Sequence, residues 1–340
     1  MKTACIYHSI DLDGWMSAAI VKHWFIENNK EHYIFDVNQM KPIKDTGEVK
    51  SKNILDFIGY NYGQPIPDLS EYDKVIMCDI SFPKNHMESL QYKLGNNFIW
   101  IDHHISAIND NKIFIKDTDE EVILYKGLRD TNFAACELTW KHFFPGELMP
   151  EIVRLLGRYD CFGHKNTDEE TKVLEFQYGA RQCICNYEEA YNYLLKSLEG
   201  VIQYDYIGQY TIEDIIHKKG VSIYQYLCTE AKQSYKNGFE INLVEEITDH
   251  IGKNIVSRKF ICINKERFNP INFGIDYHKD GYDGCACFHF NGTHWCFSLY
   301  NDNGKVDCSQ IAKRYGGGGH KGAAGMIVDL ETFKSIIQLW

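Results

Sequence analysis

The chain has 340 residues, of which 44% are hydrophobic, and its formal net charge at pH 7 is -11. This length predicts two domains of ordinary size, and the composition is that of a folded chain and not of a disordered one. The acidic charge argues against strong nonspecific binding to a long nucleic-acid duplex, because such binding depends on Lys and Arg side chains that neutralise phosphates.

The sequence contains no apolar run of about 18 residues that could span a bilayer. Acidic residues follow the N-terminus before a signal-peptide core could form, so we expect a cytoplasmic location and no membrane partner. The 12 cysteines are scattered, mostly in apolar stretches, and we expect them to be free thiols. The spacing of the two C-x-C pairs does not fit a zinc knuckle.

Short β-rich runs alternate with helical stretches in the N-terminal part of the chain. This alternation predicts a doubly wound, mainly parallel sheet, so the expected fold class is α/β. The predicted strands are TACIYH, YIFDV, KVIMCDI and NFIWIDHH. The predicted helices cover residues 15–27, 84–93, 133–144, 150–158 and 187–198. A longer helix over 211–235, ending before Gly238, is expected to connect this part to the next.

The pattern changes after this connector to strands joined by polar or glycine-bearing turns, which predicts a smaller, mixed α/β domain. The predicted strands are INLVEEI, NIVSRKFICIN, FGIDYH, CACFHFNG, HWCFSLYND and MIVDL. A short helix, CSQIAKRY, fits a start at Asp307 with Gln310 and a stop at Gly316. We therefore expect a catalytic domain over 1–190, a helical connector over 191–238 and a second domain over 239–340.

Three of the predicted strands end in side chains that can bind metals. In an open parallel sheet these strand ends lie along one edge, so their side chains should converge. An isolated Asp after a strand is commonly a turn or helix cap, but several carboxylates held close together need cations to offset their repulsion. Carboxylate and imidazole ligands without thiolate suit Mn2+ or Mg2+, and the histidines favour Mn2+. The residues are His8, Asp11 and Asp13, then Asp79, then Asp102, His103 and His104.

The motif HSIDLDG, the strand-end Asp79, the triplet Asp102-His103-His104 and the run GGGGHKGAAG together resemble the DHH phosphoesterase superfamily. The resemblance is to the branch with a DHH-associated C-terminal domain. That branch includes nano-RNases that also cleave adenosine bisphosphate, dinucleotide phosphodiesterases, RecJ-type exonucleases and exopolyphosphatase-related proteins. The resemblance implies two divalent metal ions, with Mn2+ favoured and Mg2+ or Co2+ as alternatives.

The same resemblance assigns roles to individual residues. It implies that His8, Asp11 and Asp79 bind one ion and that Asp13, Asp79, His103 and Asp160 bind the other, with Asp79 as the bridge. His104 is expected to face the scissile phosphate, and Asp102 to orient one of the neighbouring rings. Asp160, in GRYDCF, could instead be a turn residue at the end of a helix. The nearby Arg158 could contact substrate, but we expect it to have a surface role.

The glycine motif near the C-terminus is expected to hold the substrate. Glycines let the backbone approach a ligand closely, and exposed amides in such loops bind anions. The expected substrate-binding residues are Gly317, Gly318, Gly319, His320, Lys321 and Tyr300. Many relatives have an Arg where this chain has Tyr300, which could stack on a base or simply pack. The spacing between His8 and Asp11 also differs from that of relatives.

These observations predict a two-metal phosphoesterase that hydrolyses short oligonucleotides or a small nucleotide phosphate in a cleft between its domains. An exopolyphosphatase is the first alternative, and it requires a basic channel for which Arg258 and Lys259 are dispersed candidates. A nucleotide-binding protein without turnover is the second alternative. The expected partner is a short oligonucleotide or another small phosphorylated molecule, and we expect no binding to a long duplex. The sequence is also compatible with a homodimer.

Overall fold

The structure is a computed structural model, and it describes residues 1–29, 34–36, 41–43, 53–115, 120–200, 202–204, 208–249, 252–266 and 268–338. The chain divides into two compact units, Met1–Val221 and Ser222–Trp340. This division falls within the range 191–238 that the sequence predicts as a connector, and the domain bounds themselves stay a prediction. Among the described residues, no helix combines the length and the apolar character needed to cross a membrane.

The first unit is built on a parallel four-stranded sheet with the order β4-β1-β5-β6. Its strands are β1 (Lys2–His8), β4 (Ile54–Tyr60), β5 (Lys74–Cys78) and β6 (Phe98–Ile101). The chain passes from β1 outward to the edge strand β4 and then returns to the other side of β1 to form β5. The carboxyl ends of β1 and β5 therefore flank the topological switch point, where open α/β sheets bind ligands.

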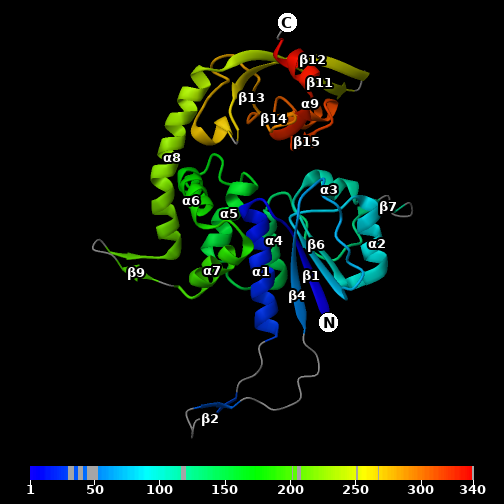
Figure 1. The fold of residues 1–340 in the computed structure, drawn as a ribbon, viewed down its shortest axis with the longest axis vertical. Helices are drawn as coiled ribbons and strands as arrows, with labels where there is room; N and C mark the ends of the chain where they lie inside the picture. Colours follow the sequence, from blue (N-terminus) through cyan, green and yellow to red (C-terminus); the bar gives the residue numbers. More distant parts are fainter. Residues whose placement is uncertain are drawn as a thin grey trace. The chain divides into compact units, whose positions relative to one another are not determined.

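Helices cover both faces of this sheet, because alternate strand residues point to opposite sides. Figure 1 shows α1 (Leu12–Asn28) and α2 (Lys84–Leu94) on opposite sides of the strands. Ile76 and Ile99 belong to the core cluster on the face of α1 and α4 (Ala135–Phe143). On the other face, Met77 and Trp100 share a core cluster with Met87 and Leu90 of α2. The predicted α/β, doubly wound fold class is confirmed.

One predicted strand is not part of this sheet. The described part of YIFDV is β2 (Ile34–Asp36), and it pairs antiparallel with β3 (Lys41–Ile43) in a separate two-stranded sheet. The place beside β1 belongs instead to β4, which the sequence analysis did not predict. Edge position explains the omission: most β4 side chains are partly exposed, so NILDFIGY lacks the continuous apolar run of a central parallel strand.

Further helices complete the first unit around the sheet. The described secondary structure adds α3 (Ile105–Asp110), α5 (Glu151–Asp160), α6 (Glu170–Cys183), α7 (Tyr187–Leu198), the 3-10 turn η1 (Gly95–Asn97), and the short strands β7 (Ile113–Ile115), β8 (Glu120–Val122), β9 (Gln203–Tyr204) and β10 (Gln209–Tyr210). The predicted helix over 187–198 agrees with α7 at both ends. Helix α6 is an addition to the predicted elements.

The long helix α8 (Ile212–Lys236) begins in the first unit and continues into the second. Two glycines let it cross α6 at very short range (Figure 1). A Cβ atom on Gly220 would lie 1.7 Å from the carbonyl oxygen of Glu175, and a Cβ atom on Gly179 would lie 2.0 Å from that of Ile216. The backbones of the two helices therefore meet without any side chain between them.

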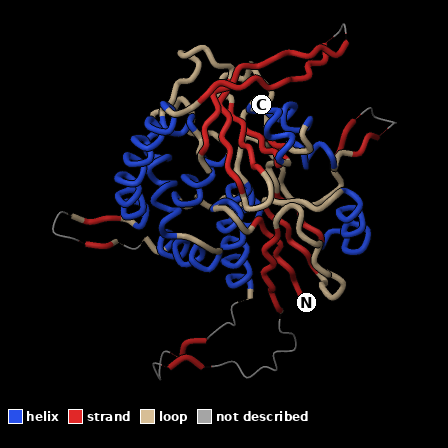
Figure 2. The backbone as a smooth tube through the Cα atoms, turned by 45° about the horizontal axis from the view of Figure 1, so that its top comes forward, coloured by secondary structure: helices blue, strands red, loops and turns tan. Residues whose placement is uncertain are grey.

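The second unit contains a mixed six-stranded sheet with the order β11-β12-β13-β14-β16-β15, whose strands are coloured red in Figure 2. Only β12 and β13 pair in parallel among the described neighbours. Its elements are β11 (Phe239–Asp249), β12 (Gly252–Asn264), η2 (Pro270–Phe273), β13 (Gly284–Phe290), β14 (Trp295–Tyr300), α9 (Cys308–Arg314), β15 (Gly318–Gly319), β16 (Ala323–Val328) and α10 (Leu330–Ile337).

The predicted strand FGIDYH is wrong. Only its first residue, Phe273, belongs to the 3-10 turn η2, which Asn269 caps by accepting a hydrogen bond from the Ile271 N–H; Gly274 follows in the left-handed region, and the segment continues in turns. Turn-forming residues thus outweigh the alternating apolar pattern. The predicted start of α9 is correct, because the Asp307 carboxylate accepts hydrogen bonds from the amides of Ser309 and Gln310.

Candidate metal centre

The ends of three adjacent parallel strands carry the predicted ligands. His8 is the last residue of β1, Asp79 directly follows β5, and Asp102 directly follows β6. Because β1, β5 and β6 are neighbours and parallel, these positions meet at one edge of the sheet. The fold therefore brings together strand ends that are far apart in the sequence: His8 and Asp102 are separated by 94 positions.

Asp11 caps α1 and also faces the centre. One of its oxygens accepts a hydrogen bond from the Gly14 N–H at 2.9 Å, so the structural interpretation of this residue is correct. Its other oxygen lies 2.6 Å from Nδ1 of His8. Gly14 makes this arrangement possible, since a Cβ atom there would lie 2.0 Å from the carbonyl oxygen of His8.

Asp13 is buried and held by the start of α4. Its two oxygens accept hydrogen bonds from the amides of Ala135, at 2.9 Å, and Cys136, at 2.7 Å. These amides belong to the first turn of the helix, which lacks internal acceptors and carries a partial positive charge. Helix α4 thus fixes a carboxylate that enters the centre from α1.

His103 joins the carboxylates at the other side of the centre. Its Nε2 lies 3.1 Å from Asp160, 3.4 Å from Asp79 and 3.7 Å from Asp13, measured to the nearest carboxylate oxygen. Asp160 is the last residue of α5. Three groups among the described residues each place their ligand atoms within 4.8 Å of one another: His8 with Asp11 and Asp79, Asp13 with His103 and Asp160, and Asp79 with His103 and His104.

Protons balance the charges of this centre when no metal is bound. Burial lowers the pKa of His8, but hydrogen bonds to Asp11 and Asp79 outweigh it and raise this pKa to about 10. Burial also opposes the charged form of His103, yet Asp160 and Asp79 hold the pKa of that imidazole far above its usual range. The pKa of the Asp13 carboxyl is raised, first by burial and then by the charges of Asp79 and Asp160. A bound metal ion would replace these protons.

The residues present fit divalent metal ions. Oδ1 of Asp79 and Nε2 of His103 are buried, and within the described part of the chain neither makes a hydrogen bond of regular geometry. The groups found among the described residues contain carboxylate and imidazole donors but no cysteine, and the 12 cysteines are free thiols. This donor set suits Mn2+ or Mg2+. Ligand roles for the individual residues stay a prediction.

His104 and Asp102 form a pair beside these groups. Asp102 is fully buried, and one of its oxygens lies 2.8 Å from Nδ1 of His104. The same oxygen accepts hydrogen bonds from the backbone amides of His103, at 2.7 Å, and His104, at 3.1 Å. Asp102 therefore contacts both the backbone of the triplet and the ring of His104, while its role in catalysis stays a prediction.

Arg158 acts within the first unit as a structural residue. Its guanidinium donates to the buried carboxylate of Glu137 and to the carbonyl oxygen of Asn132. Glu137 in turn accepts from the backbone N–H of Ala134 at the start of α4. Arg158 therefore supports the helix end that holds Asp13, a role that differs from the surface role favoured by the sequence analysis.

The glycine motif of the second unit is a β-hairpin and not an open loop. Gly318 and Gly319 form β15, which pairs antiparallel with β16, and His320 and Ala323 exchange two backbone hydrogen bonds across the turn. The amides of Gly317 and His320 donate to the carbonyl oxygens of Ala312 and Ala323, so these two amides are already used within the unit, and substrate binding by the motif stays a prediction. Tyr300 lies beside this hairpin, opposite Ala323 in the neighbouring strand pair.

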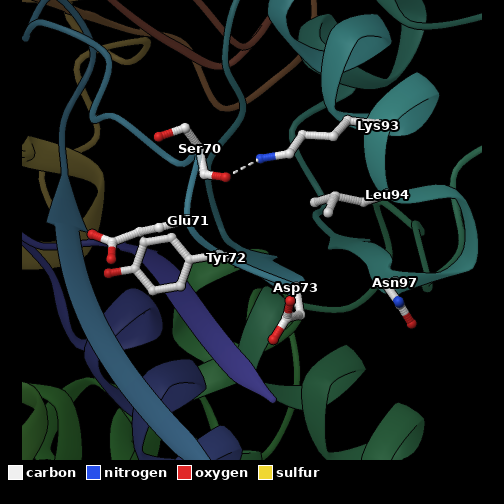
Figure 3. A pocket seen from close by; sticks show the side chains of 7 residues that line it. All are labelled: Ser70, Glu71, Tyr72, Asp73, Lys93, Leu94 and Asn97. Carbon is white, nitrogen blue, oxygen red and sulfur yellow. Dashed lines mark hydrogen bonds between the residues drawn. The ribbon is translucent and has the colours of Figure 1, made fainter.

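A surface cavity of about 370 Å³ lies away from these residues (Figure 3). It opens near the amino ends of β5 and β6, the opposite edge of the sheet from the metal centre. Lys93 reaches into this region and donates to the carbonyl oxygens of Leu69 and Ser70. None of the predicted site residues lines this cavity, whose lining residues are Ser70, Glu71, Tyr72, Asp73, Lys93, Leu94 and Asn97.

Two residues near the centre were missed by the sequence analysis. Tyr62 follows the unpredicted strand β4, and its ring centroid lies 6.4 Å from that of His8. Arg181, in the last turn of α6, donates to the hydroxyl of Tyr159, the neighbour of Asp160. Their only sequence signal is a position after a strand or near a helix end, which many tyrosines and arginines share.

Comparisons with known proteins find a family match within the first unit. Residues 3–156 match the family model described as "DHH family, N-terminal domain". The uncharacterized protein R106 of Acanthamoeba polyphaga mimivirus is 23% identical over 342 residues, which cover 94% of this chain and 66% of that protein. The chain thus spans about two thirds of the length of this relative.

Solved structures with a similar chain path include two bacterial proteins. A pGpG-specific phosphodiesterase, PggH, from Vibrio cholerae is 11% identical with a TM-score of 0.43, covering 99% of this chain and 97% of that one. An exopolyphosphatase-related protein from Bacteroides fragilis is 13% identical with a TM-score of 0.47, covering 99% and 90%. At these TM-scores the likeness carries no argument about function, which rests on the site itself.

Proposed function

We infer from the match of residues 3–156 to the DHH family model that the chain belongs to this family and that it is a phosphoesterase with two divalent metal ions. The proposed substrate is a short oligonucleotide or a small nucleotide phosphate. One observation carries this proposal: buried and partly buried carboxylates and imidazoles from three strand ends and two helices converge in overlapping metal-competent groups. So many ionisable groups at such short range are unfavourable unless cations balance them.

In the proposed centre, Asp79 is the shared ligand. It lies within 3.4 Å of both His8 and His103, so it can serve the group of each histidine. Asp11 completes the group on the His8 side, and Asp13 with Asp160 completes the group on the His103 side. Bound divalent ions supply Lewis-acid chemistry, which activates water and offsets negative charge on phosphoryl oxygens. Among such ions we propose Mn2+, because two histidines take part.

His104 and Asp102 are the proposed catalytic pair outside the metal ligands. Asp102 holds Nδ1 of His104, which fixes the ring and raises the pKa of this histidine against the opposing effect of burial. A protonated imidazole held in this way can bind a phosphoryl oxygen or donate a proton to the leaving group. A covalent enzyme intermediate is not required.

The acidic charge of the chain favours a short substrate. The net charge of -11 gives no long-range attraction to a polyanion, and the proposed metal ions act only locally. The two basic residues named as candidates for an exopolyphosphatase channel are each paired with an acid: Arg258 pairs with Glu245, and Lys259 pairs with Glu240. This observation disfavours polyphosphate as the substrate.

The test is a substrate panel with defined metals. We expect the purified chain to release mononucleotide or phosphate from dinucleotides, adenosine bisphosphate or cyclic dinucleotides, and to prefer them to polyphosphate and to strands tens of nucleotides long. Chelation should abolish this activity, and Mn2+ should restore it better than Mg2+. Full activity after elemental analysis has shown the absence of metal would contradict the mechanism. Faster turnover of long strands would contradict the short-substrate proposal.

A further inference from the structure

Tyr62 lies on a loop that is tied to the metal centre. The loop follows the edge strand β4, whose neighbour in the sheet is β1 with His8 at its end. Asn61 accepts hydrogen bonds from the backbone N–H and the hydroxyl of Ser9, at 3.3 and 3.2 Å. The backbone N–H of Asn61 donates to Gln64 at 2.9 Å, which closes the loop. The position of Tyr62 is therefore set by the same segment that carries His8.

The hydroxyl of Tyr62 lies in reach of the polar groups of Ser81, a buried residue two positions after Asp79. Burial of this hydroxyl, followed by the charges of Asp102 and Asp79, raises the pKa of Tyr62 to about 12. The phenol consequently stays neutral at physiological pH and adds no negative charge beside the carboxylates.

The side chain of Tyr62 is exposed beside the metal centre. The residue is 56% exposed, and its ring centroid lies 6.4 Å from that of His8 with an angle of 55° between the planes. Among the described residues it belongs to none of the hydrophobic core clusters. A ring with this much exposure contributes little to core packing, so packing does not explain its position beside His8.

We propose that the open face of Tyr62 is the platform on which a nucleobase next to the scissile phosphate stacks. This inference rests on the proposed phosphoesterase function and narrows its substrate to molecules with a nucleoside beside the reacting phosphate. Aromatic rings bind unstacked bases of any sequence, because every base has a π-face. A ring that is fixed in advance loses little conformational entropy when the base arrives. The platform therefore selects nucleotides over inorganic phosphate chains without selecting a base.

The experiment compares three variants on two matched substrates. Tyr62→Leu removes the ring, Tyr62→Phe retains the ring without its hydroxyl, and Tyr92→Leu is the control, since Tyr92 is a 95% exposed tyrosine on α2. The substrates are a dinucleotide and its abasic analogue. Tyr62→Leu should lower kcat/KM for the dinucleotide by about ten- to a hundredfold, mainly through KM, and should leave the abasic analogue unaffected. Tyr62→Phe should lose far less, and Tyr92→Leu should behave like wild type.

A second measurement separates this inference from the function on which it rests. A dinucleotide carrying 2-aminopurine loses fluorescence when its base stacks on an aromatic ring, and binding can be followed with Ca2+ in place of Mn2+ to suppress turnover. Quenching by wild type and by Tyr62→Phe, but not by Tyr62→Leu, supports the platform even if hydrolysis fails. The inference is overturned by equal quenching in wild type and Tyr62→Leu, by equal losses on both substrates, or by a loss in Tyr62→Phe as large as in Tyr62→Leu.

Discussion

Asp79 has a left-handed backbone conformation, with φ of 62°, at the point where β5 ends. Asp adopts this conformation more readily than most residues do, although it still costs about 1 kcal/mol. The N–H of Asp79 donates to the carbonyl oxygen of Ile101 at 2.9 Å, which ties this turn to β6. The turn directs a fully buried carboxylate toward His8 on one side and His103 on the other.

Asp79→Asn is the sharpest test of the bridging role. Asn tolerates the left-handed conformation as well as Asp does, so the backbone should keep its path while the charge is lost. Both metal-competent groups that share this carboxylate should bind ions more weakly. We expect bound metal, measured by elemental analysis, to fall from two ions to one or none, and turnover to fall about a thousandfold or more.

Asp73→Asn is the matched control for this variant. Asp73 precedes β5 at the opposite edge of the sheet, where its carboxylate accepts a hydrogen bond from the Lys2 N–H at 2.7 Å. It should retain both ions and full activity, even if it is somewhat less stable. Two ions and wild-type turnover in Asp79→Asn would mean that this carboxylate does not bridge metals.

The sequence could indicate the convergence of the candidate ligands because most of them follow an apolar run or begin a helix, whereas Asp160 ends one. To predict that His8 and Asp79 lie close together, it is enough to know that the ends of parallel strands lie along one edge of the sheet. The neighbour Tyr62 could not be found in this way. Its place depends on β4 lying beside β1, and the half-exposed residues of that edge strand do not form a distinctive pattern.

Helix α4 links the metal centre to the packing of the sheet. Its first amides hold Asp13, and its last turn carries His142 near a group of cations. Burial lowers the pKa of His142 first, and the charges of Lys126, Lys74 and Arg129 lower it further, to about 4. This imidazole is therefore neutral in the folded chain across the pH range in which an unfolded chain would protonate it.

The free energy of unfolding should consequently decrease as the pH falls through this range. Above about pH 6.5 His142 is neutral in both states and contributes no pH dependence. Between about pH 6.5 and 4, His142 binds a proton in the unfolded state but stays neutral in the folded state, so a lower pH favours unfolding. Because the side chain is only half-buried, screening reduces the effect to about 1 kcal/mol between pH 7 and 5.

Urea unfolding of wild type and His142→Gln at pH 7 and pH 5 measures this effect. The variant lacks the titrating ring, so the difference between the two proteins isolates His142 from other groups that titrate in the same range. His86→Gln is the control, since His86 is an exposed histidine on α2. The explanation fails if wild type and His142→Gln lose the same stability between the two pH values.

Elements with a strong periodic pattern were predictable, and those governed by turns or edges were not. The predicted helix over 187–198 agrees with α7. The alternating run FGIDYH does not form a strand, because the turn residues Asn269, Pro270 and Gly274 determine the backbone there. The glycine motif was recognised as a special segment, but its pairing with β16 requires a partner strand that local sequence does not identify. Local pattern thus fixes element type better than element pairing.

The two compact units carry different groups of candidate residues. The metal-competent side chains all lie in Met1–Val221, and the glycine hairpin with His320 lies in Ser222–Trp340. If His320 binds substrate, its loss should affect turnover without affecting the metal. This separation allows the role of the second unit to be measured independently of the first.

His320→Ala should retain both ions while its catalytic efficiency falls by about ten- to a thousandfold. The reason is that the imidazole would contact substrate and no metal ligand of the first unit. His294→Ala is the control, because His294 is an exposed histidine in the turn between β13 and β14 of the same sheet. Wild-type kinetics in His320→Ala, measured on the best substrate of the panel, would show that the hairpin has no part in binding.

The crossing of α6 and α8 has a consequence for the sequences that this chain can tolerate. At Gly179 and Gly220 even the smallest side chain would collide with the backbone of the other helix, and a backbone cannot rotate away as a side chain can. Neither glycine belongs to the metal-competent groups. In a library that varies every position once and selects for activity, both positions should nevertheless accept no other amino acid. In such a library, Gly179 and Gly220 would be as intolerant to substitution as Asp79. Intolerance alone would therefore not distinguish a helix crossing from a catalytic site.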